Sequence, residues 1–491
     1  MRSGDAILVL DAGTTSVRAI AFSSDGKVLG QFQLELTQHY PKPGWVEHDA
    51  GEIWDKTLAC ARAVVADLGG AGRIAGIGIT NQRETVVAWD RVTGQPLHRA
   101  LVWQDRRAGP LCERLKAEGQ ERDVQTRTGL LLDPYFSAGK MRWLLDNSEA
   151  VAAAHASGRL ALGTVESWLT FRLTGGAFIT DASNASRTSL LPLDEPGWDD
   201  TLCEIFGVPA SVLPEVVDCA GNFGATLPEL LGDDIPICGL AGDQQAATIG
   251  QGCLQPGQTK ATYGTGAFVL ASTGAKLPRS RHRMLGTVLY QIGGQRSYAL
   301  EGSVFVAGSL IKWLRDSLGL LGSAGETEEL ARSVPDSGGV VIVPALAGLG
   351  APHWRPDARA AITGMSFATS RAHLARAALE AMAMQTHDLA EAFAADGAAW
   401  RTLRIDGGMS TNDWMAQDIA NMLGITVERP DFVETTALGA GMLAAVGAGL
   451  HPTLPAAAQA MRGPVRHFTP QLDDAARSGR IAAWRKALAA I

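Results

Sequence analysis

Residues Ala6–Gly30, "AILVLDAGTTSVRAIAFSSDGKVLG", carry the strongest fold signal in the chain. Two apolar runs flank Gly13-Thr14-Thr15, and Asp25-Gly26 precedes a third run, so the segment predicts three strands joined by two tight turns. Gln258–Thr273, "QTKATYGTGAFVLAST", repeats this plan around Gly264-Thr265-Gly266. Two similar hairpins about half a chain apart predict two related halves.

Apolar strands alternate with helical patterns elsewhere in the chain. Gly51–Gly69 has apolar residues at helical spacing and precedes the strand-like Arg73–Thr80. Ser370–Phe393 has a helical apolar stripe, and Leu403–Leu423 has the pattern of a strand, a Gly-Gly turn and a helix. This alternation predicts an α/β fold. A chain of 491 residues exceeds what one hydrophobic core usually supports, so we expect two large domains.

Composition limits the partners and the compartment. The net formal charge is −8 and no basic run could follow a phosphate backbone, so we expect no nucleic-acid partner. The first residues pass directly into a strand-like run without a secretory segment, which favours a cytoplasmic protein. Ala437–Leu450, the longest apolar stretch, is too short to span a membrane and predicts a buried helix. Six widely spaced cysteines predict free thiols. The sequence does not decide whether the protein forms a homo-oligomer.

Three glycine turns follow strand-like runs, at Gly13, at Gly264-Thr265-Gly266 and at Gly407-Gly408. Each could present backbone N–H groups to phosphate oxygens, although each could also be an ordinary tight turn. The hydroxyls of Thr14, Thr15 and Thr265 favour phosphate contact. The chain has no G-x-x-x-x-G-K-[ST] loop and no G-x-G-x-x-G opening a helix, and it lacks the G-x-S-x-G and H-E-x-x-H motifs of hydrolases and zinc proteases.

Acidic residues stand at the ends of two predicted strands. Asp11 precedes the first glycine turn, where a carboxylate could bind a magnesium ion that bridges nucleotide phosphates or could simply cap the turn. Asp243 follows the predicted strand Ile235–Leu240, at the edge where open α/β sheets bind ligands. Arg83 and Glu84 follow the strand Arg73–Thr80 and combine forked donors with two acceptor oxygens. Such a pair can bind two adjacent hydroxyl groups of a ligand. The local sequence supports a surface salt bridge at the strand end equally well.

Several motifs together resemble the FGGY family of carbohydrate kinases, in the superfamily that also contains actin and the heat-shock ATPases. They occur in the family's order and the resemblance runs from Ile7 to about Ala445. The matching stretches are "YPKPGWVEHD" (Tyr40–Asp49), "GITNQRET" (Gly78–Thr85), "TGLLLDPYFS" (Thr128–Ser137), "TDASNASRTSLL" (Thr180–Leu191), "AGDQQAA" (Ala241–Ala247), "TYGTGAF" (Thr262–Phe268), "YALEGSVFVAG" (Tyr298–Gly308) and "DGGMSTND" (Asp406–Asp413).

The resemblance implies two actin-like (ribonuclease H-like) domains flanking a central cleft, with the polyol held mainly by residues 1–250 and ATP mainly by residues 251–491. The Asn-Gln-Arg-Glu, Asp-Pro-Tyr-Phe and Gly-Asp-Gln-Gln motifs are similar to those of members that phosphorylate glycerol. Carried over residue by residue, the implied polyol pocket is Arg83, Glu84, Trp103, Tyr135, Asp243, Gln244 and Phe268. The implied nucleotide contacts are Thr14, Thr15, Ser16, Arg18, Thr265, Gly308, Lys312, Gly408 and Asn412.

The implied reaction is ATP-dependent phosphorylation of glycerol to sn-glycerol 3-phosphate. Asp243 would be the general base, and Mg²⁺ would be held through water by Asp11 and Asp243. A kinase for erythritol, xylulose or another small polyol on the same scaffold is the alternative. A nucleotide-driven chaperone or filament protein is a second alternative, and the region from Gln82 to Trp103 argues against it.

Two positions depart from the family's pattern near the nucleotide. Ala12 and Lys312 each stand where many members that phosphorylate glycerol have Gln. Ala12 removes an amide beside the first turn, and Lys312 could form an ionic contact with the nucleotide or point into solvent. Some members also bind a sugar bisphosphate through a Gly-x-Arg loop, but the comparable segment here, 231–234, is acidic, so we expect no such control.

Overall fold

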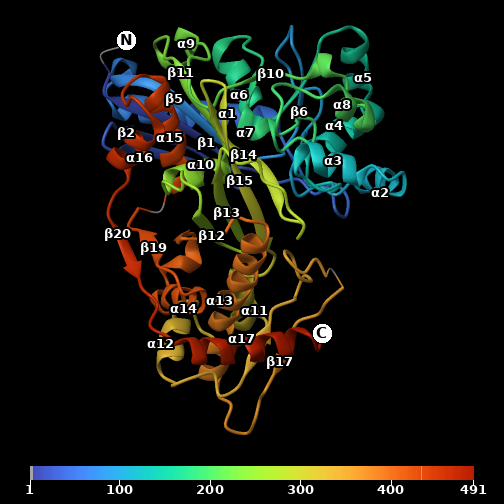
Figure 1. Cartoon of the computed structure of the whole chain (residues 1–491). Helices are drawn as coiled ribbons and strands as arrows, with labels where there is room; N and C mark the ends of the chain where they lie inside the picture. The colour runs from blue at the N-terminus through green and yellow to red at the C-terminus, as the bar shows by residue number, and fades with distance from the viewer. Residues whose placement is uncertain (1–3, 356, 433) are drawn as a thin grey trace.

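Two mixed β-sheets, one from each half of the sequence, organise the part of the chain that the computed structural model describes, residues 4–355, 357–432 and 434–491 (Figure 1). The first sheet has the order β11-β5-β1-β2-β3: β1, β2 and β3 form an antiparallel meander, and β5 and β11 run parallel to β1. Its strands are β1 (Ala6–Ala12), β2 (Ser16–Ser23), β3 (Val28–Glu35), β5 (Ile74–Asn81) and β11 (Ile237–Gly242).

The second sheet repeats the plan and extends it. Its order is β14-β15-β13-β12-β18-β19-β20, in which β12, β13 and β15 form the meander and β18 and β19 run parallel to β12. The prediction of two related halves is therefore confirmed. The strands are β12 (Gln258–Tyr263), β13 (Ala267–Gly274), β14 (Leu285–Ile292), β15 (Gln295–Val304), β18 (Thr402–Asp406), β19 (Val427–Pro430) and β20 (Val465–Phe468).

Both faces of the first sheet are covered by helices, which explains why every residue of β1 is buried. Successive side chains of a strand point to opposite faces. Leu8 and Leu10 accordingly join the cluster that contains α1 (Ala50–Asp67), whereas Ile7 and Val9 join the cluster that contains α15 (Thr435–Gly447).

Helix α15 comes from late in the sequence but packs on the first sheet (Figure 1). It crosses α10 (Asp243–Gly250) closely enough that a Cβ on Gly250 would lie 1.9 Å from the Thr435 carbonyl oxygen. Glycine is therefore required at that crossing. The next helix, α16 (Leu454–Met461), lies against α15. The proposed division at residue 250 thus separates the two sheets, while two helices from beyond it cover the first sheet.

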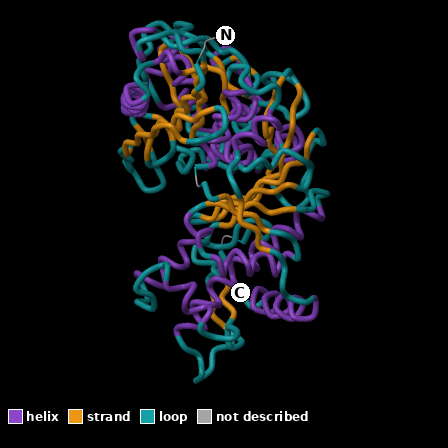
Figure 2. The backbone as a smooth tube through the Cα atoms, turned by 90° about the vertical axis from the view of Figure 1, so that its left-hand side faces the viewer, coloured by secondary structure: helices purple, strands orange, loops and turns teal. Residues whose placement is uncertain are grey.

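The remaining helices cover the sheets and form a side lobe (Figures 1 and 2). The side lobe contains α2 (Gly109–Ala117), α3 (Glu121–Thr128), α4 (Ser137–Asn147), α5 (Glu149–Ala156), α8 (Asp200–Phe206), β6 (Val87–Asp90) and β8 (Leu160–Gly163). Near the first sheet lie α6 (Val165–Thr174), α7 (Ala182–Ala185), α9 (Pro228–Leu231), β4 (Glu47–His48), β7 (Ala100–Leu101), β9 (Ile179–Asp181) and β10 (Glu215–Val217).

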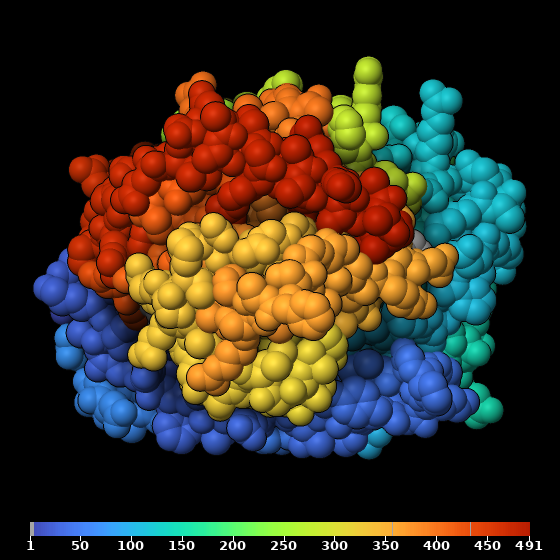
Figure 3. Space-filling view, turned by 90° about the horizontal axis from the view of Figure 1, so that it is seen from below, coloured from blue at the N-terminus to red at the C-terminus, as the bar shows by residue number. Residues whose placement is uncertain are grey.

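The second sheet carries α11 (Gly308–Asp316), α12 (Glu326–Arg332), α13 (Arg371–Ala395), α14 (Asp413–Leu423), α17 (Asp474–Leu488), β16 (Val341–Val343) and β17 (Ala361–Thr363). Seen from this end, α17 and residues 320–355 and 357–370 form the nearest surface (Figure 3).

The main local predictions are confirmed. The hairpins at Gly13 and Gly264, the helix after Ser370 and the strand-turn-helix at Leu403–Leu423 are all present. All six cysteines are buried free thiols, and the stretch from Ala437 forms the buried helix α15. No helix within the described residues is both long and apolar enough to cross a membrane.

Candidate active site

Three neighbouring strands bring the predicted acidic and basic residues to one edge of the first sheet. Thr80 of β5 lies in register with Asp11 of β1 on one side and with Ala241 of β11 on the other. Because these strands are parallel, their carboxyl ends meet at the same edge. β11 extends two residues further than predicted, so Asp243 is the first residue of helix α10.

Arg83 lies at the centre of this edge and is almost completely buried. Its Nε lies 3.3 Å from Asp243 Oδ1 and 3.7 Å from Glu84 Oε1. Its Nη2 donates to the Tyr135 hydroxyl at 3.4 Å, and its Nη1 donates to Gln245 Oε1 at 3.2 Å. The structure therefore brings together four of the predicted polyol residues: Arg83, Glu84, Tyr135 and Asp243.

Glu301 and Arg187 complete a buried network of charges around Arg83. Glu301 accepts from Arg83 Nη1 at 2.7 Å and Nη2 at 3.2 Å, and from Arg187 Nη2 at 3.1 Å. Arg187 Nε also donates to Glu84 Oε1 at 2.6 Å. Charges of opposite sign alternate through the network, which offsets much of the cost of burying them.

Glu84 is held in a backbone conformation that few non-glycine residues adopt. Its φ is 60°, in the left-handed region. Its carboxylate is bound by Arg187, and its carbonyl oxygen accepts from the Ser137 hydroxyl at 3.2 Å. Strained residues persist only where their surroundings fix them, and they concentrate at functional sites. The Arg83-Glu84 turn therefore has the kind of backbone strain that is typical of functional sites.

Two of the three carboxylates that contact Arg83, those of Asp243 and Glu301, differ in pKa. Burial raises the pKa of Asp243 to about 6, and the positive charge of Arg83 limits that rise. Burial also acts to raise the pKa of Glu301, but Arg187 and Arg83 outweigh it and lower that pKa to about 2. With these pKa values Glu301 is ionised at neutral pH, whereas Asp243 can gain and lose a proton near pH 6. The Asp243 side chain is 31% exposed, so a ligand can reach it.

Two aromatic residues stand beside the network. The rings of Trp103 and Tyr135 meet edge to face with centroids 5.7 Å apart. The Trp103 indole Nε1 donates to the Thr14 hydroxyl at 3.0 Å. The buried ammonium of Lys140 donates to three carbonyls of the 134–136 segment and so fixes the loop that carries Tyr135. Phe268, half-buried on β13, makes no ring contact with Trp103 within the described chain.

Gln244 follows Asp243 on α10 and contacts the second sheet. Its backbone N–H donates to Asp243 Oδ1 at 2.7 Å, and its side-chain Oε1 accepts from Lys260 Nζ at 2.7 Å. Lys260 is completely buried on β12, and burial lowers its pKa. The contact therefore joins a predicted polyol residue to the strand before the second glycine turn.

The position of Asp11 suits a hydrated cation better than a directly bound one. Asp11 Oδ2 accepts from Arg18 Nε at 2.7 Å, and Arg18 also binds Glu434 at the start of α15. Asp11 and Ala241 lie at the same level on strands separated by β5, roughly 10 Å apart at the usual strand spacing. Mg²⁺ commonly keeps several waters and takes few carboxylates, so Asp11 and Asp243 fit a site that water completes.

The predicted nucleotide residues lie at the turns of both sheets. Thr15 is exposed, and Ser16 begins β2. The carbonyl of Thr265 accepts from the backbone N–H of Ala307 and Ser309, and Gly308 donates to the Gly264 carbonyl at 2.9 Å. These contacts place the second glycine turn against the start of α11.

The third glycine turn lies beside the second. A Cβ on Gly407, whose φ is 87°, would lie 2.5 Å from the Tyr263 carbonyl oxygen, whereas one on Gly408 would meet open space. Asn412 caps α14 by accepting from the Met415 N–H at 2.9 Å, and it donates to the Thr327 hydroxyl at 3.2 Å. Lys312 is exposed on α11.

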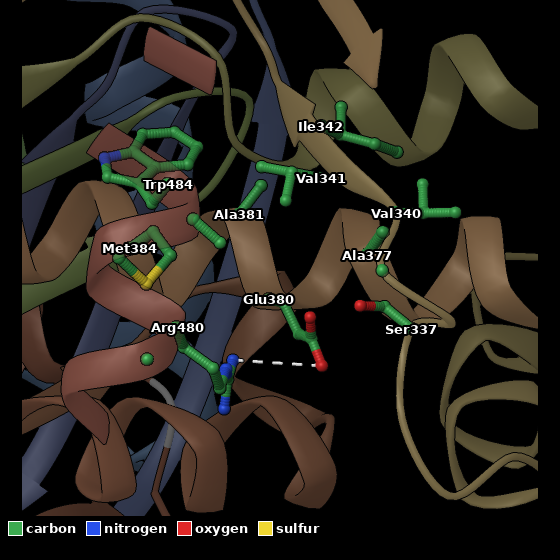
Figure 4. Close-up of a pocket in the computed structure, with 13 residues that line it drawn as sticks. Ser337, Val340, Val341, Ile342, Ala377, Glu380, Ala381, Met384, Arg480 and Trp484 are labelled. Atoms are coloured by element: carbon green, nitrogen blue, oxygen red, sulfur yellow. Dashed lines mark ion pairs between the residues drawn. The ribbon is translucent and has the colours of Figure 1, made fainter. Parts of the chain in front are cut away.

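A separate cavity of about 180 Å³ lies among α13, α17 and β16 (Figure 4). Met384, Trp484 and Ile342 contribute to its apolar lining. Within the cavity lining, Arg480 Nη2 lies 3.9 Å from Glu380 Oε1. None of the predicted site residues lines this cavity, so it is distinct from the edge of the first sheet.

Sequence patterns did not identify four residues of the site: Arg187, Gln245, Lys260 and Glu301. Lys260 is the only charged residue of β12, "QTKATY", and Glu301 is the only charged residue in the mostly buried part of β15 that follows Arg296, "SYALEGSV". Charged residues are rarely buried without partners. A lone charge in a buried strand is the signal that could have marked both.

Two family models match the chain. The model of the N-terminal domain of the FGGY family of carbohydrate kinases matches residues 6–250, and that of the C-terminal domain matches residues 259–448. A glycerol kinase from Rhodospirillum centenum is 52% identical over 485 residues, covering 98% of this chain and 97% of the relative. A glycerol kinase from Alcanivorax borkumensis is 51% identical over 488 residues, covering 99% and 98%.

Solved structures agree with these matches. A Plasmodium falciparum glycerol kinase crystallised with ADP superposes with a TM-score of 0.94 at 36% identity, covering 99% of this chain and 98% of that one. A xylulose kinase from Rhodospirillum rubrum superposes with a TM-score of 0.88 at 25% identity, covering 99% and 98%.

Proposed function

The chain belongs to the FGGY family of carbohydrate kinases, and we propose that it transfers the terminal phosphoryl group of ATP to glycerol, giving sn-glycerol 3-phosphate. The observation that carries this proposal is the contact of the buried Arg83 guanidinium with both Asp243 and Glu84. It combines a proton acceptor with groups that can bind adjacent hydroxyls. Identities of 50–52% over nearly the whole chain with glycerol kinases support the choice of glycerol.

We propose that Arg83, Glu84, Tyr135, Asp243 and Gln244 divide the hydroxyls of the triol, while Trp103 and Phe268 cover its C–H surfaces. A polyol that lacks one hydroxyl would leave a buried polar group without a partner. That loss costs about 1–3 kcal/mol, or roughly one to two orders of magnitude in specificity.

Asp243 is proposed as the general base. Its pKa of about 6 leaves the carboxyl mostly ionised at neutral pH and able to accept the proton of the attacking terminal hydroxyl. Arg83 holds this carboxylate at 3.3 Å and is itself fixed by Glu301, so the acceptor is oriented before substrate binds. Transition states of phosphoryl transfer are largely dissociative. Positioning therefore contributes more than proton removal, up to about 7–11 kcal/mol for well-oriented groups.

The glycine turns are proposed to bind the nucleotide, with Thr14, Thr15, Ser16, Arg18, Thr265, Gly308, Lys312, Gly408 and Asn412 as contacts. Asp11 and Asp243 would hold Mg²⁺ through water, and the ion would neutralise charge on the β- and γ-phosphates. Closure of the two halves around both substrates would exclude water, which otherwise competes with glycerol for the phosphoryl group.

Release of ADP in a coupled assay with glycerol, erythritol, xylulose and gluconate tests the proposal. Glycerol is expected to give the highest kcat/KM, and a preference for a four- or five-carbon substrate would assign the chain to another polyol. ATP turnover that is unchanged by any polyol would favour a chaperone or filament protein instead. Chelation of divalent cations should stop transfer, and added Mg²⁺ should restore it.

A further inference from the structure

Lys260 is completely buried at the boundary between the two sheets, yet its ammonium group has a single hydrogen-bond acceptor among the described residues. That acceptor is Gln244 Oε1, at 2.7 Å. The ammonium group carries three donors and no acceptor. The nearby carboxylate of Asp406 binds Thr262, Gln251 and Thr435 instead. A residue with no exposed surface cannot touch a substrate, so any effect of Lys260 that depends on a hydrogen bond must pass through Gln244.

The contact fixes which end of the Gln244 amide faces the substrate. Oxygen and nitrogen of an amide side chain are assigned from their hydrogen-bond partners. Lys260 can only donate, so the oxygen must face Lys260 and the NH₂ group must face away. The NH₂ group has no acceptor among the described residues and Gln244 is only partly buried, so this donor is available to a ligand.

The two residues belong to different halves of the molecule. Gln244 is on α10, directly after the first sheet, within the N-terminal family match. Lys260 is on β12 of the second sheet, two positions before the Thr262-Tyr263-Gly264 segment that leads into the second glycine turn, within the C-terminal match. A substrate-facing amide of one half is thus oriented by a charge on the other half.

We propose that Lys260 is a positioning residue that holds the Gln244 amide with its NH₂ group toward the polyol. The substrate hydroxyl at this position must then accept a hydrogen bond from Gln244 and cannot donate one to it. The inference rests on the proposed function and adds the specificity of one subsite. A hydroxyl that accepts from Gln244 keeps its own hydrogen free for a neighbouring carboxylate such as Asp243. Lys260 therefore favours glycerol binding without contacting glycerol.

A double-mutant cycle tests the proposal with Lys260→Met, Gln244→Ala and the double variant. Loss of one oriented hydrogen bond should raise the glycerol KM of each single variant about tenfold, with a smaller change in kcat and in the ATP KM. In the Gln244→Ala background, Lys260→Met should add no further increase. Independent, multiplicative effects on the glycerol KM would overturn the proposal, as would a folded Lys260→Met enzyme with the wild-type glycerol KM.

Gln244→Glu keeps Lys260 in place and decides the matter if Lys260→Met does not fold. The glutamate can still accept from Lys260 but has no NH₂ group, so its glycerol KM should rise as much as that of Gln244→Ala. A wild-type glycerol KM in this variant would overturn the proposal. Gln417→Ala, which removes an amide of α14 that donates to Asn421 Oδ1 and to the Thr469 carbonyl, is the control and should leave the glycerol KM unchanged.

The wild-type enzyme separates this inference from the proposed function. If the wild type phosphorylates glycerol and the variants behave independently, only the role of Lys260 is overturned. If the wild type phosphorylates no polyol, the proposed function is overturned and this inference with it.

Discussion

Glu301 of β15 binds Arg83 at the end of β5, with Oε2 2.7 Å from Nη1 and Oε1 3.2 Å from Nη2. The two residues are 218 positions apart: Glu301 lies in the second sheet, and Arg83 lies in the turn that follows β5 of the first sheet. Both are almost completely buried, so the forked contact is protected from solvent. The residue proposed to bind the polyol is therefore fixed from the opposite half of the molecule.

Glu301→Gln should change how the stability of the fold depends on pH. Arg187 and Arg83 lower the pKa of Glu301 to about 2 against the pull of burial. A carboxyl whose pKa is lower in the folded state stabilises the fold above its unfolded value of about 4.3 and loses that contribution as the pH falls toward 2. The variant should have a lower denaturation midpoint at neutral pH, and the difference from wild type should shrink from about pH 4.5 downward. Parallel midpoint curves for the two proteins would contradict the assignment.

Asp243→Asn should reduce kcat by at least about a hundredfold, because the variant has no carboxylate to accept the proton of the attacking hydroxyl. The fold should persist, since the asparagine oxygen can still accept from the Gln244 N–H and Glu301 still binds Arg83. ATP affinity, measured by calorimetry, should stay close to wild type. Turnover near the wild-type rate would remove the case for Asp243 as the base.

The sequence predicted the features that depend on local pattern. Alternating apolar strands and glycine turns located β1, β2, β12 and β13, and the polar residues after β5 and β11 pointed to the edge of the sheet where Arg83 and Asp243 meet. This succeeded because parallel strands bring their carboxyl ends to one edge whatever the details of packing. β11 was placed two residues early at both its start and its end.

Contacts between segments far apart in the sequence could not be predicted from local sequence patterns. Nothing local to "YALEGSV" indicates that Glu301 meets Arg83, and nothing local to α15 indicates that it covers the first sheet. Both depend on how the two halves pack together. The contact of Lys260 with Gln244 could not be predicted for the same reason, because its acceptor lies on α10.

Tyr135→Phe should raise the glycerol KM about tenfold with a smaller effect on kcat, because it removes the hydroxyl that faces Arg83 and the proposed polyol. The ring should keep its edge-to-face contact with Trp103, so stability should change little. Steady-state kinetics with varied glycerol measure the effect. Tyr298→Phe is the matched control: its hydroxyl donates to the Leu193 carbonyl at 2.9 Å, outside the site, and its glycerol KM should equal that of wild type. Equal effects of the two variants would contradict the role of Tyr135.

Thr14→Val and Thr15→Val should separate two functions within one turn. The Thr14 hydroxyl accepts from the Trp103 indole at 3.0 Å, so its loss should release Trp103 and weaken glycerol binding about fivefold even without nucleotide. The exposed Thr15 makes no such contact in the described chain, so Thr15→Val should leave glycerol affinity unchanged and raise only the ATP KM. Calorimetric titration of each variant with glycerol alone measures the difference. Unchanged glycerol affinity in Thr14→Val would show that the turn serves the nucleotide only.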